Sequence, residues 1–425
     1  MTGDSLEARF AARMGALLGP DFPKCIGLAV SGGGDSMAML ALAHGWARVM
    51  GIGLRVVTVD HGLRPEAAAE AAAVAAECRA LGHPHATLRW HWDGTGNLQD
   101  AARAARLDLI GGWRGDVGHV LYAHTRDDQA ETVLMRLLRG SGVEGLAGMA
   151  EARRVPDARG GWWLLRPLLS ETRADLRHYA DTLRLPYVDD PSNADPRFDR
   201  VRARQAMAAL GLEADGLART AARMARAAEA LAARAAEVAA RIVTDETQAG
   251  APTGDLLIDR DGLAAVERDT QMRLLAGALQ RVASAPYRPR AQALEALLDR
   301  VLAGGGGTLH GVEVTVGRAA VRLSREHAAV AGLAAPAIPG ALWDGRWRVG
   351  AGVAPGLTIR ALGPDGWAQR PADAPVAAPA RAARAWPALF DGDRLVACPA
   401  LGLGPADAIV PATGGGQIAQ SSNSH

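Results

Sequence analysis

The first half of the chain alternates between two hydrophobic periods. Short apolar runs rich in β-branched residues are separated by longer stretches in which apolar residues recur every three to four positions. The runs predict strands at 25–30, 54–59, 85–90 and 118–123, and the stretches predict helices at 37–50, 65–81, 98–112 and 127–139. Pro65 suits a first helical turn and Asn97 an N-cap. This order predicts an α/β fold, a Rossmann-like parallel sheet with helices on both faces.

The second half has a different pattern. An alanine- and arginine-rich stretch at 213–241 predicts one long connecting helix, after which we expect further helices to about Leu302. A hairpin-like segment follows at 308–326, then the linker "AAPAIPG" and short strands at 341–410. We therefore expect four parts: a large domain at 1–212, a helical connector with a small domain at 213–330, a second small domain at 338–412, and a disordered tail at 413–425.

Composition favours a soluble protein of several domains. The 425 residues exceed the usual size of one domain, and 49% of them are hydrophobic. Charges interrupt every apolar stretch well before the roughly 18 residues that a membrane span needs. The first 25 residues read as an amphipathic helix rather than a signal peptide, so we expect a cytoplasmic protein without a membrane partner.

Cysteine and lysine usage narrow the chemistry. Cys25, Cys78 and Cys398 are odd in number and far apart, which argues against a disulfide framework and against a CxxC metal or redox site. The net charge of +1 gives no general signal for nucleic acid, and Lys24 is the only lysine among 47 basic residues. Phosphate contacts must therefore come from arginine, hydroxyls or backbone amides.

The segment "LAVSGGGDSM", residues 28–37, ends the first predicted strand in a glycine loop. The loop Ser31-Gly32-Gly33-Gly34-Asp35-Ser36 places backbone amides and a helix N-terminus at the carboxyl edge of the sheet, where phosphates bind. It lacks the lysine of a Walker A loop and the spacing of a dinucleotide fingerprint. A glycine turn without a ligand is the alternative.

Two further groups lie near the same edge. Asp60 ends the second predicted strand in "VDHGLRPE", where it is equally suited to cap the next helix. In "NLQDAARAAR", Arg103 and Arg106 share a helical face, although exposed arginines on a helix are common.

Acids and arginines follow the fourth predicted strand. In "YAHTRDDQAET", Asp128 and Glu131 share one helical face and can bind Mg²⁺ or an ammonium group, although acids at a helix start also suit the helix dipole. Further on, four arginines lie within eight residues, either as a phosphate-contacting surface or as a charged helix face. They are Arg197, Arg200, Arg202 and Arg204.

The loop resembles the SGGxDS loop of the PP-loop, or N-type, ATP pyrophosphatases. Taken with "VDHGLR", "NLQDAARAAR", "AHTRDDQAET", "GSGVEGLAGM", "LLRPLL" and "DDPSNADPRFDRVRAR", it resembles the tRNA(Ile)-lysidine synthase family over residues 25–204. The second half resembles that family's two C-terminal domains more weakly. Thr125, Leu107 and Val201 depart from the family pattern, which has histidine, an aromatic residue and asparagine there.

The resemblance implies an ATP-dependent ligase that joins free lysine to the wobble cytidine of CAU-anticodon tRNA(Ile). It implies that residues 31–36 hold the ATP phosphates, with Asp35 as a catalytic residue and Mg²⁺ partner. Asp128 and Glu131 would hold the lysine, assisted by Arg103 or Arg106 at its carboxylate. The four arginines 197, 200, 202 and 204 would contact tRNA. Asp60 and Asp128 both remain candidates for the base that takes the proton of the amine.

Three alternatives stay open at this stage: a PP-loop tRNA thiolation enzyme, a small-molecule PP-loop amide ligase, and a non-catalytic tRNA-binding protein. Cytidine-type thiolation enzymes carry paired cysteines, an amide ligase needs no arginine cluster, and a binding protein needs no ATP. The oligomeric state also stays open, with a homodimer as one option.

Overall fold

The computed structural model describes residues 5–62, 66–92, 94–96, 98–157, 159–188, 195–285, 287–374 and 376–412. Pro65, Asn97 and the expected tail at 413–425 lie outside these residues. The chain divides into two compact units, residues 1–228 and 229–424, and the boundary falls within one long helix, α9 (Ala214–Ile242). The long helix predicted at 213–241 is confirmed. The domain boundaries that we expect from the sequence stay a prediction.

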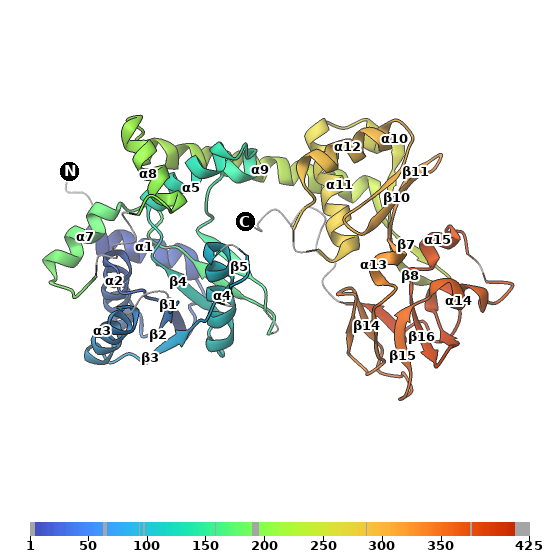
Figure 1. Cartoon of the computed structure of the whole chain (residues 1–425), viewed down its shortest axis with the longest axis horizontal. Helices are drawn as coiled ribbons and strands as arrows, with labels where there is room; N and C mark the ends of the chain where they lie inside the picture. Colours follow the sequence, from blue (N-terminus) through green and yellow to red (C-terminus); the bar gives the residue numbers. More distant parts are fainter. Residues whose placement is uncertain are drawn as a thin grey trace. The chain divides into compact units, whose positions relative to one another are not determined.

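A six-stranded sheet forms the centre of the first unit (Figure 1). Its order is β3-β2-β1-β4-β6-β5, and every pairing is parallel except that between β5 and β6. The strands are β1 (Cys25–Ala29), β2 (Gly53–Asp60), β3 (His85–Arg89), β4 (His119–Tyr122), β5 (Ala152–Val155) and β6 (Trp162–Leu165). The four strands predicted from the sequence are confirmed, and β5 and β6 are additions to them.

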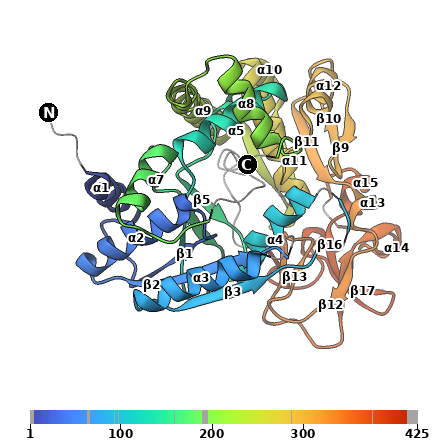
Figure 2. The same ribbon diagram turned by 60° about the vertical axis from the view of Figure 1, so that its left-hand side comes forward.

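Helices cover both faces of this sheet (Figure 2). Buried residues of α1, α2, α3 and α7 pack with Leu28 and Val56 on one face, while Ile110 of α4 packs with Val120 and Trp162 on the other. The helices are α1 (Leu6–Leu18), α2 (Gly34–Met50), α3 (Ala67–Ala80), α4 (Leu98–Trp113), α5 (Arg126–Leu138), α6 (Val143–Leu146), α7 (Arg173–Thr182) and α8 (Asp199–Ala209). The predicted doubly wound α/β fold is therefore confirmed.

In the second unit, a hairpin follows α9 where helices were expected. β7 (Val243–Gln248) and β8 (Ala251–Asp259) pair antiparallel, so the expectation of helices directly after the connector was wrong for these residues. Ala249 and Gly250 form the two-residue turn, and both have positive φ, as tight hairpin turns of the I′ type require. The helices α10 (Arg260–Ala264), α11 (Arg268–Ala283) and α12 (Ala291–Leu302) follow.

A five-stranded sheet, β7-β8-β11-β10-β9, includes the predicted hairpin. Its last strands are β9 (Gly307–Leu309), β10 (Val312–Val316) and β11 (Ala320–Arg325). A buried polar network ties β8 to β11: Asp255 Oδ2 accepts hydrogen bonds from Ser324 Oγ at 2.9 Å and from Arg322 Nη1 at 3.1 Å, and Arg322 also pairs with Glu246. Burial raises the pKa of Asp255 to about 6.

Two small sheets complete the unit, with orders β12-β15-β16-β17 and β13-β14-β18. Ala334–Pro336, expected to be linker, pairs as strand β12 with β15. The remaining elements are α13 (His327–Val330), β13 (Leu342–Trp343), β14 (Trp347–Val349), β15 (Thr358–Ala361), α14 (Gly363–Ala368), α15 (Ala380–Ala383), β16 (Pro387–Asp391), β17 (Arg394–Ala397) and β18 (Ile409–Pro411). Throughout the described residues, each helix is too short or too polar to span a membrane.

Candidate active site

The glycine loop connects β1 to α2 and leaves the start of that helix open. Gly32 has φ of +93°, a conformation that favours glycine, and Gly33 is the N-cap of α2. The described residues provide no side-chain cap for this N-terminus. Within the loop, the Ser31 amide donates to Ser36 Oγ at 3.2 Å and Ser36 Oγ donates to the Gly33 carbonyl at 2.9 Å. Open amides at a helix N-terminus are suited to bind an anion such as phosphate.

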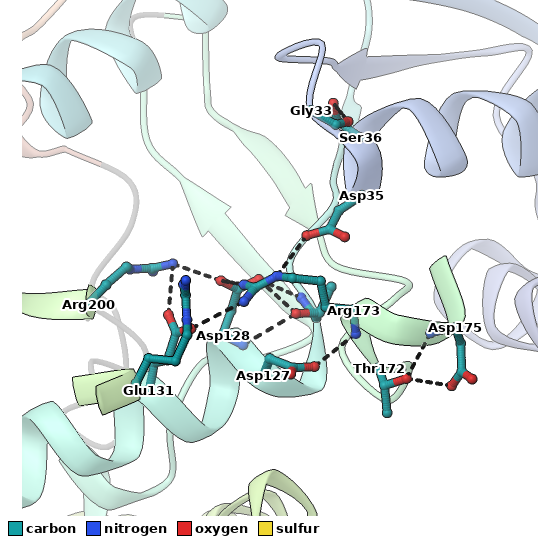
Figure 3. A network of polar contacts seen from close by, with 12 residues as sticks. Gly33, Asp35, Ser36, Asp127, Asp128, Glu131, Thr172, Arg173, Asp175 and Arg200 are labelled. Carbon is teal, nitrogen blue, oxygen red and sulfur yellow. Dashed lines mark hydrogen bonds and ion pairs between the residues drawn. The ribbon is translucent and has the colours of Figure 1, made fainter. Parts of the chain in front are cut away.

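Asp35 lies in the first turn of α2 and points away from the loop toward α7 (Figure 3). Its Oδ2 accepts a hydrogen bond from Arg173 Nε at 3.3 Å. Its Oδ1 is buried and has no hydrogen-bond partner among the described residues. Burial raises the pKa of Asp35 to about 6, although the charge of Arg173 opposes this. A buried acceptor oxygen without a donor is costly unless a cation or another donor binds there.

Asp128 is fixed at the start of α5 by a capping box with Thr125. The Thr125 amide donates to Asp128 Oδ2 at 2.8 Å, and the Asp128 amide donates to Thr125 Oγ1 at 3.3 Å. The other carboxylate oxygen, Oδ1, accepts from Arg200 Nη1 at 2.9 Å and from Arg173 Nη2 at 3.1 Å. Burial acts to raise the pKa of Asp128, but the nearby arginines outweigh burial and hold that pKa below its usual value.

Glu131 lies one turn further along α5 on the same face, with 1% of its side chain exposed. Its Oε1 accepts from Arg204 Nε at 3.0 Å and from Arg173 Nη1 at 3.4 Å. Its Oε2 is 4.0 Å from Arg200 Nη1, and it has no hydrogen-bond partner among the described residues. The structure therefore brings Asp35, Asp128 and Glu131 together around shared arginines.

Arg173 joins these three carboxylates and is a residue that the sequence analysis missed. It is the first residue of α7, whose N-cap Thr172 accepts a hydrogen bond from the Asp175 amide. Its own amide donates to Asp127 Oδ2 at 2.9 Å, so both the backbone and the side chain contact α5. A threonine followed three residues later by aspartate is a helix-start signal, which identifies the first position of α7 but not the partners of its side chain.

Arg106 lies near the end of β2, where Asp60 is the last residue of the strand. Its Nη2 is 3.2 Å from Nε2 of His61, the residue that follows Asp60. Burial and the charge of Arg106 lower the pKa of His61 to about 4, so this imidazole is neutral at pH 7. Burial, Arg200 and Arg153 lower the pKa of Arg103, which places Arg103 and Arg200 in one positive field.

The four arginines near α8 divide into two pairs. Arg200 and Arg204 contact the acids of α5, as described above. Arg197 and Arg202 instead pair with Asp195 and Asp199 close to them in sequence, and their side chains are 86% and 56% exposed. Arg197 and Arg202 are therefore the more exposed pair, whereas Arg200 and Arg204, at 38% and 42% exposure, are directed at the acids of α5.

The three departures from the family pattern have structural roles here. Thr125 is fully buried and caps α5. Leu107 of α4 packs against the apolar core under that helix, and Val201 is buried in α8. His124, just before Thr125, accepts a hydrogen bond from Arg166 Nε at 3.2 Å. Burial and Arg166 lower the pKa of His124 to about 3, so a neutral histidine stands beside the site.

A metal ion bound by protein ligands alone does not fit this site. No group of three His, Cys, Asp or Glu side chains in the described part of the chain is placed to hold one. Asp35 with its unsatisfied Oδ1 fits instead as a single protein partner to Mg²⁺ that is bound mainly by phosphates and water, as is common for nucleotide-bound Mg²⁺.

Known proteins resemble this chain both in its first domain and over most of its length. Residues 6–210 match the family model of the PP-loop domain. A tRNA(Ile)-lysidine synthase from Ruegeria pomeroyi is 42% identical over 404 residues, covering 94% of this chain and 92% of that protein. Those from Rhodopseudomonas palustris and a Bradyrhizobium species are 47% and 43% identical, covering 60% and 70% of this chain and 73% and 88% of those proteins. The chain therefore belongs to the tRNA(Ile)-lysidine synthase family.

Proposed function

We propose that this protein joins lysine to the wobble cytidine of CAU-anticodon tRNA(Ile), using ATP and releasing AMP and pyrophosphate. The names of its relatives support this activity. One observation of the structure carries the proposal: two buried carboxylates on α5 face the open N-terminus of α2 across a single arginine side chain. This arrangement would put a site for phosphate next to a site for an ammonium group.

ATP would bind at the glycine loop, with its phosphates against the amides and hydroxyls of residues 31–36. Mg²⁺, held by the phosphates and Asp35, would neutralise charge on the leaving pyrophosphate. The cytosine carbonyl oxygen then attacks the α-phosphorus while the bond between the α- and β-phosphates breaks. This converts a poor leaving group on the base into AMP.

Lysine would bind at Asp128 and Glu131. Glu131 Oε2 is buried and lacks a donor among the described residues, so an amino group placed there gains a charge-assisted hydrogen bond. Arg103 or Arg106 would bind the carboxylate of the lysine. The ε-amine attacks the activated carbon, the bond to AMP breaks, and the amine loses a proton.

The proton of the amine passes to a carboxylate, for which Asp128 and Asp60 are the candidates. Asp128 accepts hydrogen bonds from Thr125, Arg173 and Arg200, and its lowered pKa suits it to binding a cation rather than accepting a proton. Asp60 ends β2, the neighbour of the strand that leads into the glycine loop. We therefore assign Asp60 as the general base and Asp128 as an electrostatic partner of the lysine.

Exposed arginines would position the tRNA. Arg197 and Arg202 present guanidiniums at the surface, where they can contact phosphates. Arg200 and Arg204 connect this surface to the acids of α5. The C-terminal unit would add contacts to the tRNA.

The test is transfer of labelled lysine to CAU-anticodon tRNA in the presence of Mg²⁺ and ATP, followed by digestion and separation of the nucleosides. We expect label on cytidine at the wobble position and none on a tRNA whose wobble base is uridine. Sulfur incorporation, or lysine-independent ligation to a small molecule, would instead support one of the PP-loop alternatives. Binding of tRNA without any ATP-dependent product would support a non-catalytic binding protein.

A further inference from the structure

Arg173 contacts the ATP side and the lysine side of the candidate site at once. Its three guanidinium nitrogens lie 3.3 Å from Asp35, 3.1 Å from Asp128 and 3.4 Å from Glu131, each nitrogen at a different carboxylate. In Figure 3 the side chain extends between Asp35 and the two acids of α5. A cation that binds either set of acids is therefore repelled by the same guanidinium.

Three guanidiniums, those of Arg173, Arg200 and Arg204, already contact Asp35, Asp128 and Glu131, and Asp127 is a fourth acid close to Arg173. An ammonium group that enters this buried cluster is repelled by these guanidiniums, and the repulsion is strong in a medium of low dielectric constant. Withdrawal of one arginine would therefore favour the binding of lysine.

Arg173 is the arginine most suited to leave. Arg200 and Arg204 approach their acids at 2.9 Å, closer than any of the three Arg173 contacts. Because the Arg173 amide is bound to Asp127 Oδ2, the backbone stays in place while the side chain rotates. Its side chain is 23% exposed, less than the 38% of Arg200 and the 42% of Arg204, so the choice of Arg173 rests on its longer contacts and its link to Asp35.

Nucleotide binding would supply the new partner. The guanidinium already touches Asp35 in the first turn of α2, beside the loop that would hold the phosphates. Phosphate oxygens are strong acceptors for arginine, and a cation at Asp35 removes one of the contacts that hold Arg173 in place. Both effects draw the side chain away from Asp128 and Glu131.

We propose that Arg173 is a displaceable cation that occupies the lysine site until nucleotide binds, so that lysine binds tightly only after ATP. This inference rests on the proposed function, because it takes Asp128 and Glu131 as the lysine site. Arg173 acts here as a positioning residue that couples two ligands. Such coupling is reciprocal, so lysine would strengthen nucleotide binding by the same factor.

The experiment is calorimetric titration of free lysine into the full-length protein, with and without Mg²⁺ and an ATP analogue that carries a methylene bridge between its α- and β-phosphates. The variants are Arg173→Gln and Arg173→Lys. Arg55→Gln is the matched control, because Arg55 lies near the start of β2 and pairs with exposed Asp116. Thermal unfolding of each variant reports whether it folds.

For the unmodified protein and Arg55→Gln, we expect the analogue to lower the Kd for lysine by about fivefold or more, the usual range of such coupling. Arg173→Gln should bind lysine without nucleotide as tightly as the unmodified protein does with it, and the analogue should then change the Kd less than twofold. Arg173→Lys, which cannot contact three carboxylates together, should show intermediate coupling.

Two results overturn the inference. If folded Arg173→Gln binds lysine no more tightly than the unmodified protein in the absence of nucleotide, Arg173 only supports the structure of the site and does not compete with lysine for the acids. If the unmodified protein binds lysine equally with and without the analogue, the coupling does not exist even though lysine binding by this protein stands. Failure to bind lysine under both conditions overturns the proposed function as well.

Discussion

The Thr125 backbone amide donates a hydrogen bond to Asp128 Oδ2 at 2.8 Å, and the Asp128 amide returns one to Thr125 Oγ1. This reciprocal cap uses one carboxylate oxygen of Asp128 for the helix and leaves the other, Oδ1, directed at Arg173 and Arg200. Thr125 therefore orients the acid without contributing chemistry of its own. The departure from histidine at this position is compatible with an intact site.

Replacing Thr125 by valine tests this role. Valine keeps the shape but removes the hydroxyl, so we expect the free energy of unfolding to fall by about 1 kcal/mol, as for other lost N-caps. The KM for lysine should rise because Asp128 loses its fixed orientation. Chemical denaturation and steady-state kinetics measure the two effects, with Thr125→Ser as the control that keeps the hydroxyl. Unchanged stability and KM in the valine variant would show that the backbone amide alone orients Asp128.

Asp35→Asn separates catalysis from tRNA binding. The variant keeps the shape of the side chain but loses the charge that would hold Mg²⁺ at the leaving phosphates. We expect turnover to fall on the order of a hundredfold or more, in line with the loss of other charge-stabilising groups, while the Kd for tRNA changes less than twofold. Filter binding measures the Kd. Equal losses of turnover and of tRNA affinity would mean that Asp35 is needed for the protein to fold and not for the reaction of ATP.

The two arginine pairs near α8 should have separable effects. Replacing both Arg197 and Arg202 by glutamine should weaken tRNA binding and reduce the slope of log Kd against log salt concentration by about 1.5, because two phosphate contacts are lost.

The matched pair, Arg200 and Arg204, leads to a different expectation. Replacing both by glutamine should mainly reduce turnover and raise the KM for lysine, since these two residues balance the charges of Asp128 and Glu131. A larger loss of tRNA affinity in this second double variant than in the first would mean that Arg200 and Arg204, and not Arg197 and Arg202, contact the tRNA.

Asp255 predicts a pH dependence of stability in the C-terminal unit. Its pKa in the folded protein, about 6, lies above its ordinary value of 3.8, so the folded state binds the proton more tightly than the unfolded state. This group therefore lowers stability as the pH rises from about 4 to about 6, and its full cost, on the order of 2–3 kcal/mol, is present above pH 6.

Asp255→Asn is neutral at every pH and removes that cost. We expect slower hydrogen exchange in peptides from β8 and β11 than in the unmodified protein at pH 7.5, with the difference vanishing by about pH 3.5. Comparing the two proteins at the same pH cancels the intrinsic pH dependence of hydrogen exchange. A variant that exchanges faster at both pH values would show that the charge of Asp255 stabilises the network with Arg322.

Much of the first unit could be predicted from local pattern. The runs predicted as β1, β2 and β4 are largely buried, β3 is only partly buried, and the glycine loop follows from the abrupt change after Val30, so β1–β4 and the helices between them appear where expected. The short strands β5 and β6 were not predicted, because β5 (Ala152–Val155) contains two adjacent arginines and β6 (Trp162–Leu165) shows no alternation with polar residues. The β7–β8 hairpin was missed because its turn, Ala249-Gly250, lacks the usual asparagine or aspartate.

Contacts between side chains that are far apart in sequence could not be predicted from the local sequence pattern. Arg173 and Asp35 are 138 residues apart, and nothing local to either residue indicates that they meet. Likewise, the spacing of Arg200 and Arg204 predicts a basic helix face, whereas their contacts with Asp128 and Glu131 depend on how α8 packs against α5. The types of residues at the site were predictable, but their partners depend on the fold.

The central claim is that the acids of α5 hold lysine beside bound ATP, and Glu131→Gln tests it most directly. Steady-state kinetics with CAU-anticodon tRNA give the KM for lysine and for ATP in the variant and in the unmodified protein. Loss of a hydrogen bond to a charged group costs about 1.5–3 kcal/mol, so the KM for lysine should rise by about tenfold or more while that for ATP stays within twofold. An unchanged KM for lysine, or an equal rise for ATP, would contradict the account.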